Sequence, residues 1–253
     1  MISATNRTAL TDGTRYSTVT MTGPDGSRYG GTGFYVGRKR ILTCAHNLHG
    51  MSNVVIEPGS NASGDAPFGR ATVQSAGWRI APGYSGSGDW AHDLAVIDNA
   101  PIAAPNGQWF SFLQATPSDR MPLVVCGYSA QSDAVPALTQ AIDGERQHLH
   151  GGYASEQPDA ETIEYAILTL KGASGSPVYH LSRGSGALQA LIVAVHVTGQ
   201  PAAQGRNGGC FVTPQKIDWI EGRTSAFALH APVRALGSTS VHWDDAPYYP
   251  QSS

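Results

Sequence analysis

The chain has 253 residues, of which 41% are hydrophobic and 14% charged, and its formal net charge is −3. This balance gives no electrostatic case for a nucleic acid partner, since phosphate binding needs a surplus of basic side chains. No apolar run reaches the length of about 18 residues that a membrane-spanning helix needs, so we expect no membrane partner. The length and the 30 glycines suit one two-lobed all-β domain, or two small ones.

Short apolar segments separated by turn residues recur along the chain. A first set lies at residues 17–21, 32–36, 41–44, 54–57, 71–74 and 94–98. A second set lies at residues 123–126, 161–170, 177–181, 190–197 and 210–213. Many short strands at short intervals predict a barrel or a sandwich.

The remaining segments read as connections. Residues 58–67 and 131–156 are polar and predict loops, the second of them bordering a cleft. Residues 100–117 would link the two strand sets. Thr213 and Pro214 before residues 215–221 predict a short helix, with the threonine as cap and the proline at its first position.

His46 closes the segment 40–45, which we predict to be a buried strand. Small residues before it let the chain turn and bring the ring to a surface. An imidazole can take the proton from a serine hydroxyl, which is a poor nucleophile until a base does so. His46 is therefore the candidate general base, although a structural histidine after a strand is also common.

Asp93 directly precedes the apolar run 94–97. A carboxylate at the mouth of a buried strand is costly unless it is hydrogen-bonded, and it can hold an imidazole in the tautomer that catalysis needs. Asp89 and Asp98 could cap a turn or the strand equally well. Asp93 is preferred because it stands directly before the strand.

The strongest signal is Gly172-Ala173-Ser174-Gly175-Ser176-Pro177. Ser174 is the candidate nucleophile. Gly172 can adopt a backbone angle that other residues resist. The N–H groups of Gly172 and Ser174 can then point to one spot and form an oxyanion hole.

These motifs, in the order His, Asp, Ser, resemble those of chymotrypsin-fold serine proteases. Within that fold the chain most resembles the bacterial glutamyl endopeptidase branch, the staphylococcal V8-like proteases, from about residue 6 to residue 220. Residues 6–12, 31–37 and 126–128 and the strand ending at His196 also carry this resemblance.

The resemblance implies an all-β fold of two six-stranded antiparallel β-barrels with a short C-terminal helix and an extra C-terminal tail. Residues 1–105 would form the barrel with the histidine and the aspartate. Residues 106–222 would form the barrel with the serine and the specificity pocket, and residues 223–253 an extension. The implied activity is that of a monomeric serine endopeptidase that cuts a protein or peptide substrate through an acyl-enzyme intermediate.

The resemblance also implies a substrate pocket. Thr169 and His196 match the pocket threonine and histidine of the glutamyl branch, which predicts cleavage after Glu, with Asp tolerated, since both side chains can hydrogen-bond a carboxylate. Val197, Thr198 and Gly199 would form the edge strand that pairs with an extended substrate. Leu168 stands where trypsin-like pockets carry an aspartate, which argues against Arg or Lys as the preferred residue.

Two other hypotheses stay open at this point. Leu168, Leu170 and Lys171 also fit a protease of the same fold that prefers small or apolar residues. Ala173 replaces the acidic residue that pairs with a newly cut N-terminus in mammalian digestive enzymes. That replacement and the unmatched extension fit a non-catalytic binding protein on a protease scaffold.

Cys44, Cys126 and Cys210 lie in apolar strand-like sequence and are expected to be small buried hydrophobes. No C-x-x-C or H-E-x-x-H pattern occurs, so we predict no catalytic metal and no cofactor. The N-terminus lacks the apolar core of a signal peptide, yet the resemblance starts within a few residues of Met1. We therefore expect a secreted mature form whose leader was removed, with an intracellular protein as the alternative.

Overall fold

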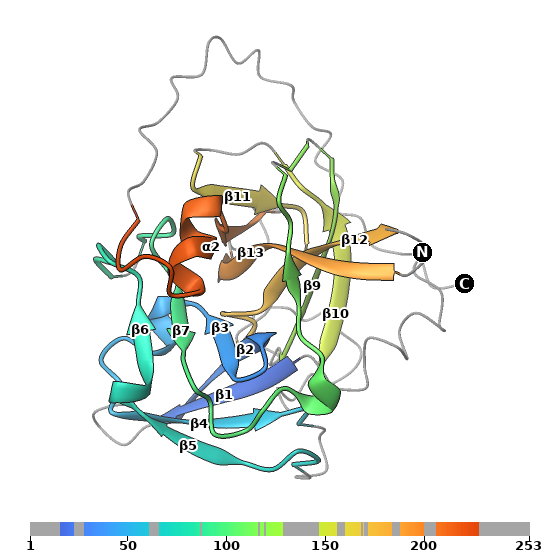
Figure 1. Cartoon of the computed structure of the whole chain (residues 1–253). Coiled ribbons are helices and arrows are strands. Elements are labelled where there is room, and N and C mark those ends of the chain that lie inside the picture. The colour runs from blue at the N-terminus through green and yellow to red at the C-terminus, as the bar shows by residue number, and fades with distance from the viewer. Residues whose placement is uncertain are drawn as a thin grey trace.

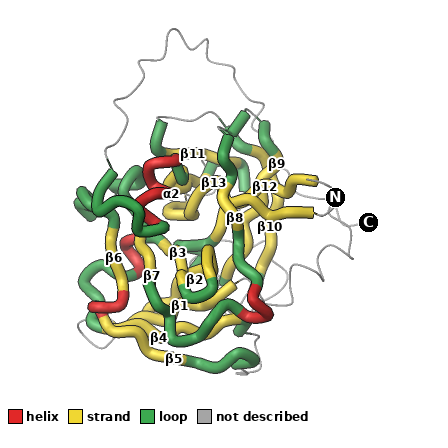
Figure 2. The backbone as a smooth tube through the Cα atoms, in the orientation of Figure 1, coloured by secondary structure: helices red, strands yellow, loops and turns green. Residues whose placement is uncertain are grey.

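The computed structural model describes residues 16–22, 28–60, 66–86, 88–115, 117–118, 120–128, 147–155, 160–167, 169, 172–183, 188–199 and 206–227. These residues form two curled β-sheets, one after the other along the chain, and a short helix that lies beside both (Figure 1). Figure 2 shows the same backbone with its helices, strands and loops in different colours. No helix in the described part of the chain is long and apolar enough to span a membrane.

The first sheet is antiparallel throughout and has the order β5-β4-β1-β2-β3-β7-β6. Its strands are β1 (Tyr16–Thr22), β2 (Arg28–Gly37), β3 (Arg40–Thr43), β4 (Asn53–Pro58), β5 (Ala71–Gln74), β6 (Trp78–Ile80) and β7 (Ala95–Ile97). One turn of 3-10 helix, Ser75–Gly77, connects the two edge strands β5 and β6. The chain therefore brings the two edges of the sheet together, which curls it into a barrel and protects its edges.

The second sheet has the order β10-β9-β12-β13-β14-β11, and the short β8 pairs in parallel with β13. Its strands are β8 (Ser111–Phe112), β9 (Pro122–Gly127), β10 (His148–Tyr153), β11 (Thr162–Tyr165), β12 (Pro177–Arg183), β13 (Leu188–Gly199) and β14 (Asn207–Phe211). Hydrogen bonds close this sheet as well. Ser155 N donates to Glu164 O at 2.7 Å and Ala166 N to Tyr153 O at 3.2 Å, which joins the edge strands β10 and β11.

The all-β, chymotrypsin-like double-barrel fold is confirmed. Each sheet has seven strands within the described residues where six were expected, because β6 and β8 are two or three residues long and carry no pattern of their own. The expected loop 131–156 contains β10, whose sequence His-Leu-His-Gly-Gly-Tyr gives no strand signal and becomes a strand by pairing with β9. Of the predicted strand 161–170, the described residues form a strand only at β11. Residues 6–12, residues 61–65 of the predicted loop 58–67 and residues 228–253 of the extension lie outside the described residues.

Apolar side chains form three clusters. One fills the first barrel, around Tyr35, Ile41 and Ile97, and another fills the second, around Ile163 and Val193. The third lies between the barrels and takes buried side chains from both sheets and the helix. Its largest members are Phe34, Phe110, Tyr128, Tyr179 and Trp219. The site described below lies where the loops of the two barrels meet across this shared cluster.

The short helix α2 (Pro214–Ile220) follows the second sheet and lies against the first. Thr213 caps it by accepting a hydrogen bond from Lys216 N, as predicted, and Ile217 and Ile220 are buried. Arg79 of β6 donates to the carbonyl oxygens of Trp219 and Ile220 at 3.1 and 3.3 Å. A cation thus satisfies the carbonyl end of the helix and fixes it to the first barrel.

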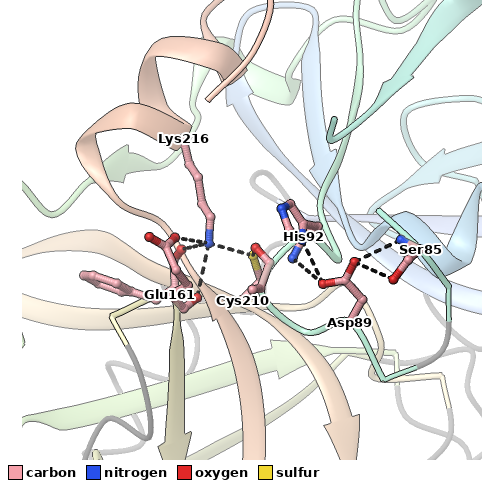
Figure 3. A network of polar contacts seen from close by, with 8 residues as sticks. Ser85, Asp89, His92, Glu161, Cys210 and Lys216 are labelled. Atoms are coloured by element: carbon pink, nitrogen blue, oxygen red, sulfur yellow. Dashed lines mark hydrogen bonds and ion pairs between the residues drawn. The ribbon is translucent and has the colours of Figure 1, made fainter. Parts of the chain in front are cut away.

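Lys216 points from α2 into the protein interior and is fully buried (Figure 3). Its ammonium lies 3.0 Å from the Glu161 carboxylate and donates to the carbonyl oxygens of Glu161 and Phe211 and to the Cys210 sulfur. The Cys210 thiol in turn donates to Ala91 O, on the loop that leads to Asp93. A chain of polar contacts therefore runs from the helix through the second barrel to that loop.

Replacing Lys216 with methionine should strongly lower the free energy of unfolding. The change leaves the Glu161 carboxylate buried without its counter-charge, which costs about 3–5 kcal/mol. The matched control is Arg223→Met, since Arg223 pairs with Asp218 at 2.7 Å but is 57% exposed, so its loss costs about 0–1 kcal/mol. Denaturant titration of both variants measures the difference, and equal losses of stability would contradict the assignment of Lys216 as a buried anchor.

Candidate active site

Pairing of β3 with β7 brings His46 and Asp93 together. Thr43 is opposite Ala95 in this antiparallel pair. His46 follows β3 on one turn of 3-10 helix, Ala45–Asn47, and Asp93 stands just before β7. Because the end of one strand meets the start of its antiparallel neighbour, the two side chains emerge at the same edge of the barrel.

The Asp93 carboxylate holds His46 by two hydrogen bonds. Its Oδ1 accepts from the His46 backbone N–H at 2.9 Å, and its Oδ2 lies 2.6 Å from the ring Nδ1. Asp93 is buried, while the His46 side chain is 35% exposed. This arrangement places the ring proton on Nδ1 and leaves the lone pair on Nε2.

The pKa of His46 is shifted upward by its neighbours. Burial of the ring lowers it, but the Cys44 sulfur and the Asp93 carboxylate raise it, and the net direction is upward. Burial raises the pKa of the Cys44 thiol, so this thiol stays protonated near neutral pH. The charged partner that stabilises the imidazolium is therefore Asp93.

The two alternative aspartates have other partners. Asp89 accepts from the backbone N–H and the hydroxyl of Ser85 and lies 2.8 Å from Nδ1 of His92 (Figure 3). Asp98 accepts from Arg40 at 3.0 Å and from Arg79 at 2.6 Å. Of the three aspartates, only Asp93 contacts His46 within the described residues.

The loop with Ser174 belongs to the second barrel, but the first barrel holds it. The carbonyl oxygen of Ser174 accepts from the Thr32 backbone N–H at 2.8 Å and from Asn47 Nδ2 at 3.0 Å. The Thr32 hydroxyl donates to Gly172 O at 2.9 Å. We call this set of contacts, made by Thr32, Thr43 and Asn47, the serine-loop clamp.

Sequence reasoning gave none of the clamp residues this role, and it did not single out Asn47 at all. Asn47 is buried, and its amide donates to the Thr43 hydroxyl as well as to Ser174 O. The Thr43 hydroxyl donates to Thr32 O at 2.8 Å, so every clamp residue is tied to another. A polar residue directly after His46, in an otherwise apolar segment, was the available signal.

Gly175 shows how tightly the clamp encloses the serine loop. Its φ is +85°, a value that glycine adopts readily and other residues resist. A Cβ atom at this position would collide with Thr32 O, the Thr43 hydroxyl and Asn47 Nδ2. Glycine is therefore required here for two independent reasons, backbone angle and space.

The proposed oxyanion donors are free in the part of the chain that the structure describes. No carbonyl there accepts from the N–H of Gly172 or Ser174, and Gly172 has a φ of +87°. The Ser174 hydroxyl makes no hydrogen bond to His46 among the described residues. Nε2 of His46 lies instead 3.5 Å from the Cys44 sulfur. Contacts between a serine and its base are often loose without substrate and tighten when it binds.

His196 lies directly behind the serine loop. Its backbone N–H donates to Ser176 O at 2.9 Å, and its carbonyl accepts from Gly175 N at 2.8 Å. The ring is buried, and its Nδ1 lies 2.6 Å from the Tyr165 hydroxyl, which donates to Gly208 O at 3.0 Å. Burial, with a smaller effect of the charge on His46, lowers the pKa of His196 to about 3, so the free ring is neutral.

Thr169 carries a buried polar atom without a partner. Its Oγ1 has no hydrogen bond within the described residues, although it is shielded from solvent. Buried hydroxyls are hydrogen-bonded in the great majority of cases. Its neighbours Leu168, Leu170 and Lys171, which bear on the hypothesis of small or apolar preference, lie outside the described residues.

The segment predicted to pair with substrate, residues 197–199 of β13, has a strand partner on only one of its two edges among the described residues. β13 pairs with β12 only as far as Val195, whereas its pairing with β14 continues to Gly199. A β-bulge between His196 and Thr198 changes the register there. Along 197–199 one edge of β13 therefore has no strand partner among the described residues.

The comparison with protein families gives the identification. A family model described as a trypsin-like peptidase domain matches residues 31–185, more than half of the chain and all three of His46, Asp93 and Ser174. The chain belongs to the trypsin-like peptidase domain family. It is a serine peptidase that acts on protein or peptide substrates. No curated protein sequence matches the chain significantly.

Solved structures show the same fold at low identity. A Glu endopeptidase in complex with MPD is 22% identical, with a TM-score of 0.62 over 89% of this chain and 96% of that one. The protease Anisep from Arthrobacter nicotinovorans is 18% identical, with a TM-score of 0.60 over 79% and 91%. An inactivated protease paralogue of the scabies mite is 12% identical, with a TM-score of 0.62 over 84% and 95%. At these identities the likeness shows the fold and leaves the specificity of this peptidase open.

Replacing Gly175 with alanine should abolish most peptidase activity. The new methyl group collides with the clamp, and a displacement of the serine by about 1 Å can cost about 10²-fold in rate. The matched control is Gly50→Ala, at a φ of +77° with no atom within 4 Å of the new Cβ, which carries only the backbone strain of about 1–2 kcal/mol. Hydrolysis rates and thermal unfolding of both variants test this. Equal effects would show that the backbone angle matters at Gly175 and the clamp does not.

Proposed function

We propose that the protein is a serine endopeptidase of the glutamyl endopeptidase type, with His46, Asp93 and Ser174 as its catalytic triad. Nε2 of His46 takes the proton of the Ser174 hydroxyl as the oxygen attacks the substrate carbonyl, and then gives it to the leaving amine. Asp93 keeps the ring proton on Nδ1 and stabilises the imidazolium. Water then repeats the cycle on the acyl-enzyme.

The oxyanion of the tetrahedral intermediate would be held by the free N–H groups of Gly172 and Ser174. Such fixed donors stabilise charge that develops in the transition state, and this contribution is usually the largest single one in catalysis. The Thr32 hydroxyl, bound to Gly172 O, holds the peptide group between Gly172 and Ala173, which lies between the two donors in the chain. The serine-loop clamp therefore supports both the nucleophile and the oxyanion hole.

The observation that carries the Glu preference is the unpartnered hydroxyl of Thr169. A buried hydroxyl without a hydrogen bond costs about 1–3 kcal/mol, and a substrate carboxylate would satisfy it. Thr169 lies four residues after Tyr165, whose hydroxyl contacts His196. The two proposed pocket residues are thus linked through one short segment of chain.

The hydrogen bonds of Tyr165 determine which ring nitrogen of His196 carries the proton. Since its hydroxyl donates to Gly208 O, it accepts from Nδ1 of His196, and the proton of the neutral ring is on Nδ1. Nε2 then has only a lone pair, which a carboxylate would repel. A Glu side chain therefore binds together with a proton on Nε2, and the resulting contact is a charge-assisted hydrogen bond.

Extended substrate would add a strand to the free edge of β13 at Val197, Thr198 and Gly199. Main-chain hydrogen bonds along such an edge give affinity without regard to sequence, and the pocket supplies the preference. One of the similar folds is titled a Glu endopeptidase, which supports the branch by analogy. We also propose that the peptidase works as a secreted monomer.

Mapping of the bonds cut in a denatured protein mixture tests this function. We expect cleavage after Glu, which Ser174→Ala should abolish. Thr169→Val should lower kcat/KM for a Glu peptide by about tenfold or more, since one hydrogen bond to a charged group contributes about 1.5–3 kcal/mol. The same variant should leave cleavage after Ala in an otherwise identical peptide nearly unchanged, which separates pocket chemistry from general damage.

The other outcomes have definite meanings. Equal cleavage after Glu and Ala would refute the pocket and favour a protease with small or apolar preference. No cleavage, together with no labelling of Ser174 by a serine-directed phosphonate, would refute the triad. The protein would then be a binding protein on a protease scaffold.

Replacing Asp93 with asparagine should lower kcat on the order of 10⁴-fold, because the ring loses its orienting carboxylate. It should also shift the pH profile. Asp93 raises the pKa of His46, and only the neutral ring can act as a base, so activity rises with pH through that pKa. Without the carboxylate the pKa falls, and the acid limb of kcat/KM moves to lower pH. The control is Asp89→Asn, which alters the partner of His92 and should change neither kcat nor the acid limb of kcat/KM. Equal effects of the two variants would contradict the assignment of Asp93 as the partner of the catalytic base.

A further inference from the structure

Cys44 lies against the working nitrogen of the proposed base. Its sulfur is 3.5 Å from Nε2 of His46. The thiol is free and fully buried, and acyl transfer gives it no task. In the neutral ring Asp93 holds the proton on Nδ1, so Nε2 carries the lone pair and can accept from the S–H group of Cys44.

The distance between these two atoms is that of two ligands on one metal ion. Zn–S bonds are about 2.3 Å and Zn–N bonds about 2.0–2.1 Å, and at a tetrahedral angle these lengths separate sulfur from nitrogen by about 3.5 Å. The pair Cys44 Sγ and His46 Nε2 therefore needs no rearrangement of its spacing to share an ion. The side chain of His46 is 35% exposed, which gives an ion access from solvent.

Asp93 supplies the usual outer partner of a metal-binding histidine. Its Oδ2 lies 2.6 Å from Nδ1 of His46, and donor atoms of Cys44, His46 and Asp93 all lie within 4.8 Å of one another. A carboxylate on the second ring nitrogen fixes the tautomer and makes the metal-binding nitrogen more basic. The contact that prepares His46 for base catalysis thus also prepares it for a metal ion.

We propose that Cys44 and His46 form an inhibitory site for a soft or borderline divalent cation such as Zn²⁺ or Cd²⁺. The ion binds the Cys44 thiolate and the lone pair of Nε2, and the thiol proton is released to solvent. The Nδ1 proton stays on the hydrogen bond to Asp93, and water fills the remaining positions. Thiolate and imidazole select such ions over Ca²⁺ and Mg²⁺, which prefer oxygen ligands. Inhibition follows because Nε2 can no longer take the serine proton.

Binding is tested first, in the Ser174→Ala protein, with Cd²⁺ as the probe. We expect one Cd²⁺ per chain and an ultraviolet thiolate-to-cadmium charge-transfer band, with a rise in thermal stability as the site fills. Cys44→Ala in the same background should abolish the band. Cys126→Ala, which removes another buried thiol, should keep it. A band that survives Cys44→Ala, or its absence from the Ser174→Ala protein, would overturn the site.

A second variant keeps the test decisive if Cys44→Ala does not fold. Asp93→Asn retains both metal ligands but removes the outer carboxylate, so it should weaken Cd²⁺ binding by about 10–100-fold. Unchanged affinity in that variant would contradict the geometry proposed here. Far-ultraviolet circular dichroism of each variant establishes that it is folded.

Inhibition is tested second, and only this step rests on His46 being the catalytic base. Zn²⁺ and Cd²⁺ should stop peptide hydrolysis by the unaltered protein, with full recovery on addition of EDTA, whereas Ca²⁺ should have no effect. In Cys44→Ala, the ion concentration that halves the variant's own rate should rise at least about tenfold, since one of two protein ligands is lost. Metal binding without inhibition would refute the role of His46 and keep the site, while inhibition that Cys44→Ala leaves unchanged would refute the site.

Discussion

The carbonyl oxygen of Ser174 is the point on which the site depends. It belongs to the second barrel, yet it accepts its two hydrogen bonds from Thr32 and Asn47 of the first. No local feature of residues 172–177 could hold the serine opposite His46, because histidine and serine are on different barrels. The buried amide and hydroxyls of the clamp fix this relation, and such groups are costly to leave unpaired, so the arrangement resists displacement.

Buried polar contacts join the two barrels at two further places. Arg79 of the first barrel closes the carbonyl end of α2, and Lys216 of α2 leads through Cys210 to the loop before Asp93. All three cysteines are free, so no disulfide within the described residues holds the barrels together. The shared apolar cluster supplies the adhesion, and the buried polar contacts fix the angle at which the barrels meet.

Sequence reasoning predicted the parts of this molecule that are local. The strand segments, the cap at Thr213 and the pairing of His46 with Asp93 follow from patterns a few residues long. It missed β10, whose two glycines and two histidines form a strand only because β9 offers a partner. It also missed Asn47, because its role comes from contacts with a loop more than a hundred residues away. Both misses concern contacts between distant segments, which no short window of sequence contains.

Two histidines of this peptidase lie in environments that shift their pKa values in opposite directions. His46 is paired with a carboxylate, which raises its pKa and stabilises its charged form, whereas His196 is buried beside a hydroxyl, which leaves it neutral. When their environments shift the pKa values of two titratable groups in opposite directions, the two groups usually have different roles. A general base gains a proton during the reaction, so a carboxylate that is always beside it, as Asp93 is beside His46, stabilises the charge it acquires. In the proposed pocket His196 would gain its proton only together with the substrate, so its anion would be the carboxylate of the substrate itself.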